Sequence, residues 1–420
     1  MKPTVRSAAT LRPMRPARAT LASMATRRGA EAPPPPRRVT GLVGIAIALG
    51  IVLGSGIAAA LPTHPADAVA QASAAPCDIV PVFPSPAAAV GRRLDAVLIR
   101  IDEATYAPGI GAAVLFPDGT SWTGARGYAD VERQQPVTSS TGFAFASAGK
   151  IAIAGLLLRA AERAELSLSD SVAALLPRSP ISPRATVAQL LSHRAGLGDY
   201  LTAGSTEAAI AADPDALLRP DDLLTAAGDP RAPGVFDYSN TGYLFAAALL
   251  ERDGERYLDR LRRELLDPFE LCSISAPALE PSPVALARGY DARNGGWIPT
   301  ADDVVMGPGR AVLSAAGPAG GLAGTPLDLA RLGAVVMGDA FLSAASRERA
   351  FPDSAGSYGL GFMRYSIAGH VVYGHNGRLG GTRTAVRFDP ASGIAVAVAW
   401  NRGDPDPDTA AALLLAAALR

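Results

Sequence analysis

The sequence has 420 residues, of which 49% are hydrophobic and 19% are charged, and its 39 basic and 39 acidic side chains balance. This composition excludes a largely disordered chain, and the zero net charge offers no field that would attract nucleic acid. The two cysteines and four histidines are too few and too scattered to form a zinc site. We therefore expect ordinary side chains or a bound cofactor to carry the chemistry, and we expect no zinc site and no nucleic-acid partner.

The first 87 residues divide into three segments by composition. Residues 1–40 form a basic leader without the periodicity of a helix or strand, and we expect it to be disordered and cytoplasmic. Residues 41–61 contain no charged side chain and are long enough to cross a bilayer, which takes about 20 apolar residues. Residues 62–87 are rich in alanine and proline, which is typical of a flexible tether.

The apolar segment 41–61 is either a transmembrane anchor or the apolar part of a signal peptide, and the sequence leaves both open. Ala68-Val69-Ala70 is an acceptable small-x-small cleavage site, so cleavage would fall near Ala70. The basic flank stays in the cytoplasm in both cases, which makes the rest of the chain extracytoplasmic, either membrane-anchored or secreted. Export permits a disulfide between Cys77 and Cys272, and two unpaired thiols are the alternative.

Residues 88–420 have the pattern of one domain with strands at both of its ends. Near its start we expect a helix at 90–102 and then a hairpin, whose strands at 110–116 and 121–128 are joined by a turn at 117–120. Near its end we expect three strands and a closing helix, at 371–374, 384–388, 394–400 and 409–419. The pattern predicts the α/β fold class, of α+β type: an antiparallel sheet built from both chain ends and flanked by helices, plus an inserted, mainly helical lobe.

Lysine is rare in this chain, and one lysine lies beside a candidate nucleophile. Of the 39 basic residues only Lys2 and Lys150 are lysines, and a lysine, unlike an arginine, can lose its proton in an apolar environment. Lys150 follows Ser147 by three residues at the start of an apolar helical segment, so the two side chains would share one helix face. The pattern favours a serine activated by a neighbouring base, although Ser147 could also be a helix cap.

Two further segments carry polar side chains suited to the same reaction. Tyr238-Ser239-Asn240 precedes an apolar helix at 244–250, and a turn with a helix cap is the simpler interpretation. His375-Asn376-Gly377 ends a short strand, where a turn with a surface histidine is the alternative. Neither segment is specific when it is taken alone.

Together, in order and spacing, Ser147-Ala148-Gly149-Lys150, Tyr238-Ser239-Asn240 and His375-Asn376-Gly377 resemble the three motifs of the serine penicillin-recognising enzymes. The resemblance is to the serine β-lactamase and penicillin-binding-protein-like family. It points to the branch that holds class C β-lactamases, D-alanyl-D-alanine carboxypeptidases, D-aminopeptidases and related esterases. It covers residues 88–420, whereas an α/β-hydrolase is disfavoured because no G-x-S-x-G occurs.

The resemblance implies a role for each matching residue. Ser147 would form the acyl-enzyme, and Lys150 and Tyr238 would share the proton transfers without a fixed division between them. The implied substrate-binding residues are Asn240, His375, Asn376 and Gly377. The oxyanion hole would be formed by the backbone N–H groups of Ser147 and Arg378.

Two residues near these motifs are harder to interpret. Arg378 departs from the small residue common at this position in the family, and its guanidinium would either select an acidic substrate or point to solvent. His193 lies in a loop whose family counterpart is structural, and we expect it to be structural here.

These observations predict an exported serine hydrolase that needs no metal and no cofactor. The favoured activity is that of a carboxypeptidase or aminopeptidase acting on D-amino-acid peptides such as those of peptidoglycan. A small-ester esterase is the second interpretation, and a β-lactamase is the third because His375 stands where class C β-lactamases usually have lysine. The competing class is a non-catalytic, membrane-tethered cell-wall binding protein, against which the complete motifs argue. We expect a monomer whose partners are its substrate and, if segment 41–61 is uncleaved, the membrane.

Overall fold

The computed structural model describes residues 83–177, 184–293, 296–299 and 309–420. The predicted leader 1–40, the apolar segment 41–61 and most of the tether 62–87 lie outside the described residues. Across the described ranges, no helix combines the length and the apolar character needed to cross a membrane. Cys272 is disulfide-bonded, but Cys77 lies outside the described residues, so the pairing of these two cysteines stays a prediction.

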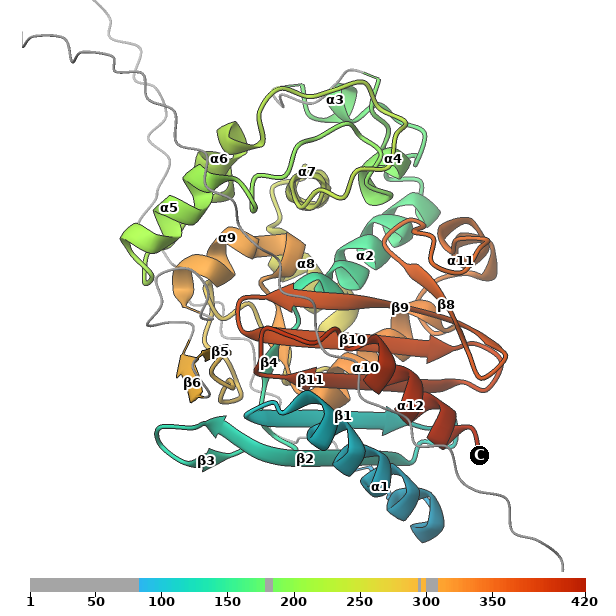
Figure 1. The fold of residues 1–420 in the computed structure, drawn as a ribbon. Coiled ribbons are helices and arrows are strands. Elements are labelled where there is room, and N and C mark those ends of the chain that lie inside the picture. Colours follow the sequence, from blue (N-terminus) through green and yellow to red (C-terminus); the bar gives the residue numbers. More distant parts are fainter. Residues whose placement is uncertain (1–82, 178–183, 294–295, 300–308) are drawn as a thin grey trace, which may run out of the picture. The chain divides into compact units, whose positions relative to one another are not determined.

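A seven-stranded antiparallel sheet brings the two ends of the domain together (Figure 1). Its strand order is β3-β2-β1-β11-β10-β9-β8, so the first strand of the sheet pairs directly with the last. The strands are β1 (Gly109–Leu115), β2 (Ser121–Asp130), β3 (Gln135–Pro136), β8 (Met363–Ile367), β9 (His370–Leu379), β10 (Thr382–Asp389) and β11 (Ile394–Trp400). The predicted fold class, with an antiparallel sheet assembled from both chain ends, is confirmed.

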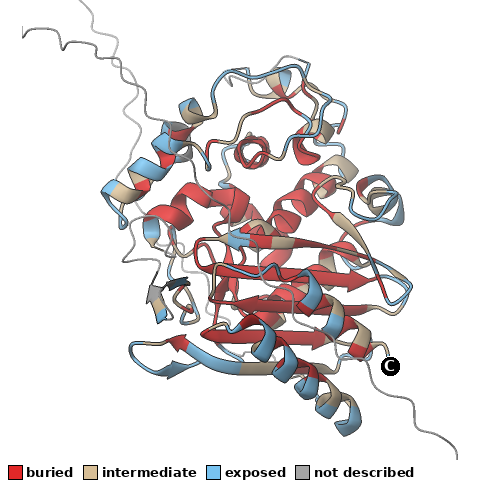
Figure 2. Cartoon of the chain, in the orientation of Figure 1, coloured by how far each residue is buried: buried red, intermediate tan, exposed pale blue. Residues whose placement is uncertain are grey.

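Helices cover both faces of this sheet. Helices α1 (Ala88–Thr105) and α12 (Asp408–Ala418) pack on one face, and α10 (Pro326–Met337) packs on the other. Strand β11 shows how its sequence fits both layers, because its large side chains face α1 and α12 while its alanines face the α10 side. Side chains alternate between the faces of a strand, so β11 is buried along its whole length (Figure 2).

The segment between β2 and β8 forms a mainly helical part of the domain. Its elements are β4 (Phe143–Ala144), η1 (Ala146–Gly149), α2 (Lys150–Glu162), α3 (Val172–Leu175), α4 (Val187–Leu191), α5 (Gly204–Ala212), α6 (Pro220–Leu223), η2 (Leu224–Ala227), α7 (Thr241–Leu250), α8 (Tyr257–Leu261), η3 (Arg262–Leu266), β5 (Tyr290–Arg293), β6 (Gly296–Pro299), α9 (Arg310–Gly320), β7 (Ala323–Gly324) and α11 (Ala344–Ala350). The first nine residues of helix α2 are all buried and, after Lys150, all are apolar or glycine, as expected of a helix inside a core. It packs against α7, α9 and α10.

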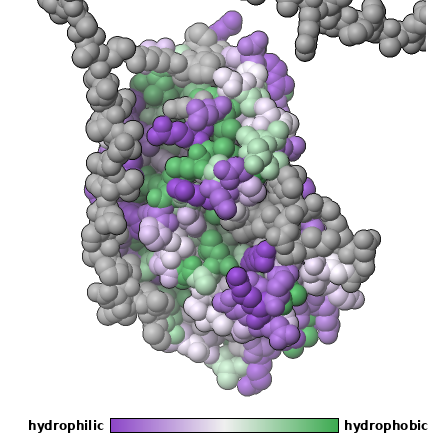
Figure 3. Space-filling view, turned by 90° about the vertical axis from the view of Figure 1, so that its left-hand side faces the viewer, coloured by the Kyte–Doolittle hydropathy of each residue, from purple (hydrophilic) through white to green (hydrophobic). Residues whose placement is uncertain are grey.

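The side of the domain that carries α5 and α9 mixes apolar and polar surface (Figure 3). Apolar side chains there lie between strongly hydrophilic ones rather than forming one uninterrupted face. Surface of this mixed kind is ordinary for a folded domain, so we base the functional site on side-chain geometry instead.

Candidate active site

Ser147 and Lys150 lie side by side at the junction of η1 and α2. The Lys150 Nζ is 3.0 Å from the Ser147 Oγ, as the three-residue spacing predicts. Lys150 is fully buried, while Ser147 is half-buried. The chain therefore presents a reachable hydroxyl next to an amine that has been removed from water.

The contacts of Lys150 favour a neutral amine whose lone pair faces Ser147. Its Nζ donates to the Asn240 Oδ1 at 2.7 Å and to the Ala319 carbonyl oxygen at 2.6 Å. Both oxygens can only accept, so they take the two N–H bonds of a neutral amine. The remaining position faces the Ser147 Oγ, where a lone pair can receive the hydroxyl proton.

The electrostatics of the site agree with this arrangement. Burial lowers the pKa of Lys150 to about 7, against the opposing effect of the Asp199 charge. Such an amine exists in substantial part as the free base at neutral pH, which suits a general base.

We expect activity to fall as the pH is lowered through about 7, because Lys150 then becomes an ammonium ion and loses the lone pair. Burial lowers the pKa of His375 to about 3 and that of His193 to about 2, so neither imidazole should titrate in the same range. The measurement is kcat/KM from pH 5 to 9, with an expected tenfold fall per pH unit on the acid side. A flat profile between pH 5 and 8 would contradict this role of Lys150.

Close packing against the sheet fixes the position of η1. Gly377 of β9 lies against Phe145, and the Thr384 Oγ1 of β10 donates to the Phe145 carbonyl oxygen at 2.7 Å. A Cβ atom at position 377 would lie 2.1 Å from that carbonyl oxygen and 2.2 Å from the Thr384 Oγ1. Only glycine allows β9 to approach η1, the serine turn, this closely.

Replacing Gly377 with alanine is accordingly expected to displace η1 and lower kcat by at least about tenfold, with a loss of stability of about 1–3 kcal/mol. The matched control is Gly91→Ala in α1, where an added Cβ meets nothing within 4 Å. Thermal unfolding and kcat of both variants test the prediction. Normal activity of Gly377→Ala would show that the serine turn tolerates the shift.

Tyr238 approaches the same centre from the loop before α7. Its ring centroid is 5.3 Å from the Lys150 Nζ. Its hydroxyl is buried without a hydrogen-bond partner among the described residues. Burial raises the pKa of Tyr238, and the nearby Ser147 hydroxyl lowers it by less. The phenol is therefore protonated at neutral pH.

His193 forms the wall behind Tyr238, and its part in the site could not be seen in the sequence. Its ring stacks on that of Tyr238 with centroids 4.0 Å apart and an interplanar angle of 29°. The Ser239 N–H donates to the His193 Nδ1 at 3.2 Å. A neutral imidazole thus supports the tyrosine from behind and binds the backbone of the next residue.

His375 reaches the site through a second tyrosine. Its Nδ1 lies 2.6 Å from the Asn376 carbonyl oxygen, to which it donates, so its Nε2 accepts from the Tyr358 hydroxyl at 2.9 Å. The rings of His375 and Tyr238 are 6.5 Å apart, and Tyr358 packs edge-on against both. Sequence reasoning missed Tyr358, whose only signal was its place in the family-like segment Tyr358-Gly359-Leu360-Gly361-Phe362.

The Asn376 side chain points away from Ser147, so the structure does not bring it to the site where the resemblance implies a substrate-binding role. Its Nδ2 donates to the Asp408 Oδ1 at 2.8 Å and its Oδ1 accepts from the Arg387 guanidinium at 2.7 Å, both on the α12 side of the sheet. Alternation along β9 explains the placement, because His375 and Gly377 face Ser147 and the residue between them must face away.

The structure also places the two other predicted residues, Asn240 and Arg378, whose roles stay predictions. Asn240 contacts Lys150 directly, and its Nδ2 donates to the Asp199 Oδ2 at 2.9 Å. Arg378 follows Gly377 on β9, so its backbone is near the serine turn, but its side chain is exposed. Arg378 pairs with Arg383 across β9 and β10, and burial and then the Arg378 charge lower the pKa of Arg383 to about 10.

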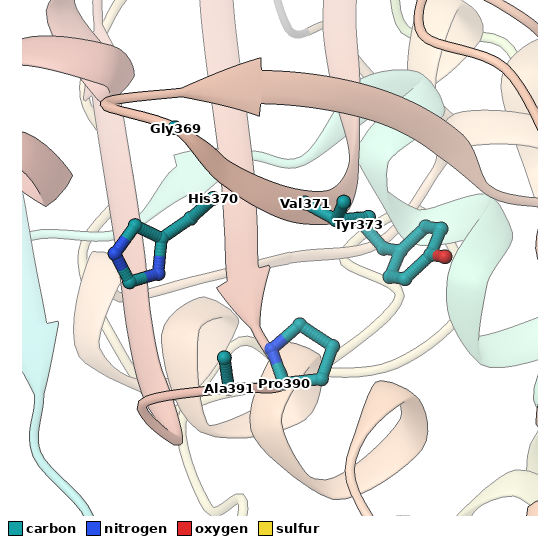
Figure 4. A pocket seen from close by; sticks show the side chains of 6 residues that line it. All are labelled: Gly369, His370, Val371, Tyr373, Pro390 and Ala391. Carbon is teal, nitrogen blue, oxygen red and sulfur yellow. The ribbon is translucent and has the colours of Figure 1, made fainter.

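A separate pocket of about 510 Å³ lies at the other end of β9 (Figure 4). Its walls come from the first residues of β9 and from the turns before β9 and after β10, and they include His370, Val371, Tyr373 and Pro390. The His370 Nδ1 is 2.8 Å from the buried Asp389 Oδ2. None of the predicted catalytic residues lines this pocket, so we do not assign the reaction to it.

The sheet, the helical insertion and the buried Ser147–Lys150 pair together define a serine hydrolase of the fold shared by β-lactamases and penicillin-binding proteins. The chain belongs to the Beta-lactamase family, whose model matches residues 94–420.

Relatives with known names agree with this assignment. Penicillin-binding protein 4 of Amycolatopsis lactamdurans is 28% identical over 325 residues, which cover 71% of this chain and 82% of that protein. D-aminopeptidase of Cereibacter sphaeroides (strain ATCC 17023) is 28% identical over 347 residues, which cover 78% of this chain and 63% of that protein. The chain thus spans less than two thirds of the length of the aminopeptidase. It also covers only 57% of the length of the putative penicillin-binding protein PbpX of Bacillus subtilis (strain 168).

Among solved structures, D-amino acid amidase from Ochrobactrum anthropi SV3, complexed with D-phenylalanine, is similar with a TM-score of 0.68. The match covers 78% of this chain and 98% of the amidase at 21% sequence identity. At that identity the likeness shows the common fold alone.

Proposed function

We propose that this protein is an exported serine hydrolase that cleaves peptides or amides of D-amino acids through an acyl-enzyme on Ser147. The observation that carries the proposal is the 3.0 Å contact between the Ser147 Oγ and a buried Lys150 whose other two partners are obligate acceptors. The names of the relatives support the substrate class, since one is a D-aminopeptidase and a protein of the same fold is a D-amino acid amidase.

In the proposed reaction, the Ser147 Oγ attacks the carbonyl carbon as its proton passes to the Lys150 Nζ. A carbon–oxygen bond forms, and the negative charge on the carbonyl oxygen is stabilised by the backbone N–H groups of Ser147 and Arg378. The Tyr238 hydroxyl gives its proton to the leaving nitrogen as the carbon–nitrogen bond breaks, and the Lys150 ammonium group restores it. A water molecule then hydrolyses the ester. The different pKa directions of Lys150 and Tyr238 support Lys150 as the base and Tyr238 as the acid.

The substrate class is tested by comparing mirror-image substrates. Purified full-length protein is assayed with the D- and L-forms of alanine amide and with a peptide ending in D-Ala-D-Ala, beside Ser147→Ala. We expect hydrolysis of the D-substrates at least about tenfold faster than of the L-form, and none by the variant. Activity confined to short esters would contradict the proposal in favour of an esterase, and efficient penicillin hydrolysis would favour a β-lactamase.

The cellular location is part of the same proposal. We place the hydrolase domain outside the cytoplasmic membrane because residues 41–61 are uncharged and follow a basic segment. Protease added to intact spheroplasts should degrade the domain, and the amino terminus of the mature chain should distinguish cleavage near Ala70 from a retained anchor. An unprocessed chain that is recovered in the cytoplasm and protected from protease would contradict export.

A further inference from the structure

Asp199 lies behind the catalytic centre and binds Asn240 through two hydrogen bonds and Leu201 through a third. Its Oδ2 accepts from the Asn240 Nδ2 at 2.9 Å, and its Oδ1 accepts from the backbone N–H groups of Asn240 at 3.3 Å and Leu201 at 3.1 Å. Asp199 does not contact the Ser147 hydroxyl, and no family motif in the sequence contains it. The proposed reaction therefore assigns no step to its carboxylate.

The segment that carries Asp199 is joined firmly to the loop that carries Asn240. The Gly198 carbonyl oxygen accepts from the Ser239 Oγ at 2.8 Å and from the Thr241 Oγ1 at 2.7 Å. The Tyr200 N–H donates to the same Thr241 Oγ1 at 3.1 Å. These bonds flank Asp199 and Asn240 on both sides, so the carboxylate and the amide cannot move independently.

This arrangement decides which end of the Asn240 amide faces Lys150. The oxygen and nitrogen ends of an amide have nearly the same shape, and only their partners distinguish them. A carboxylate accepts, so the end of the amide that faces Asp199 must be the NH₂ group. The opposite end, the Oδ1, must then face the Lys150 Nζ, which it does at 2.7 Å.

We propose that Asp199 is a positioning residue that keeps the Asn240 oxygen toward Lys150 and thereby directs the lone pair of Lys150 at Ser147. The inference rests on the proposed function, because it needs Lys150 to act as the base. If the amide were reversed, an N–H group would point at the lysine nitrogen and bind the lone pair that must receive the Ser147 proton. Lys150 would then remain beside Ser147 without being able to activate it.

The charge of Asp199 acts on Lys150 as well. It raises the pKa of Lys150, while burial lowers that pKa by more. The other titratable groups that face Lys150 are rings, which burial keeps neutral: Tyr238, Tyr243, His193 and His375. Removing the carboxylate should therefore lower the pKa of Lys150, and a reversed amide would lower it further by disfavouring the ammonium form.

The test follows acylation of Ser147 in the full-length protein by p-nitrophenyl acetate, a substrate that needs no specific recognition. The acetyl adduct is measured by intact mass against time between pH 5 and 9. For Asp199→Asn we expect acylation slower by roughly 10- to 100-fold at pH 8. We also expect the acid limb of the pH–rate profile, where the rate falls as Lys150 is protonated, to move to lower pH. A matched control is Asp328→Asn, which removes another buried carboxylate that accepts from a backbone N–H, that of Ser273.

The double variant Asp199→Asn with Asn240→Asp, here called the exchanged pair, gives a second test, in which the acid limb should move in the opposite direction. It restores an obligate acceptor opposite Lys150 and puts the negative charge closer to it. We therefore expect faster acylation than in Asp199→Asn alone, with the acid limb moved above that of the wild type. This variant also keeps the inference testable if the single substitution unfolds the protein, which thermal unfolding would reveal.

An unchanged rate and acid limb in Asp199→Asn would overturn the inference, as would equal losses in Asp328→Asn. An exchanged pair whose acid limb does not rise would overturn it too, because a purely structural role predicts no movement. A wild-type protein that is not acylated at Ser147 would overturn the proposed function and this inference with it. Acylated wild type with unaffected variants would overturn only the role of Asp199.

Discussion

Replacing Ser147 with alanine is expected to lower turnover of every substrate by at least about 10⁴-fold while leaving the fold intact. The substitution removes the only atom that can form the ester, and the half-buried site can accommodate the smaller side chain. Steady-state kinetics and thermal unfolding measure the two parts of the prediction. Ser140→Ala is the matched control, because Ser140 is an exposed serine whose hydroxyl contacts only the nearby Thr138 in the described structure.

Residual activity within tenfold of the wild type would mean that another group attacks the substrate. Equal losses in Ser140→Ala would instead point to a general effect on the protein.

Replacing Lys150 with arginine is expected to be nearly as damaging, with kcat/KM lowered by about 10³-fold or more. Arginine keeps the positive charge but cannot be deprotonated in a protein, so it cannot take the Ser147 proton. It also forces a permanent charge and a larger side chain into a position that is fully buried. Kinetics over the same pH range should show that the acid limb near pH 7 has disappeared along with most of the rate.

The control for this substitution is Arg159→Lys on the same helix. Arg159 is partly exposed and pairs with Glu162 at 2.8 Å, so the reverse exchange should change kcat/KM by less than about twofold. A near-normal rate for Lys150→Arg would show that Lys150 contributes only charge, and Tyr238 would then have to be the base.

The sheet could be predicted well because its signals are local. Strand β11 has the bounds expected from its apolar run, and the hairpin of β1 and β2 follows from its turn. The meeting of both chain ends in one antiparallel sheet was also expected. The strand order was not, because register between distant strands is set by packing and leaves no mark in a single strand's sequence.

The candidate site likewise contains residues that the sequence could predict and residues that it could not. Ser147 and Lys150 are three residues apart, so helix geometry alone brings them together. Asp199, His193 and Tyr358 come from loops that fold over the site, and a single sequence does not show which loops those are. The face of Asn376 could have been predicted, since strand alternation places it opposite His375 and Gly377, but the family resemblance pointed the other way.

The central claim, that Ser147 is an acylated nucleophile, is tested most directly by intact-mass analysis of the full-length protein after incubation with a penicillin. A penicillin opens on attack by a serine and stays attached until water removes it. We predict a stoichiometric mass increase on the wild type, mapped by peptide analysis to Ser147, and none on Ser147→Ala. Equal masses for the two proteins, with the penicillin left intact, would contradict the claim.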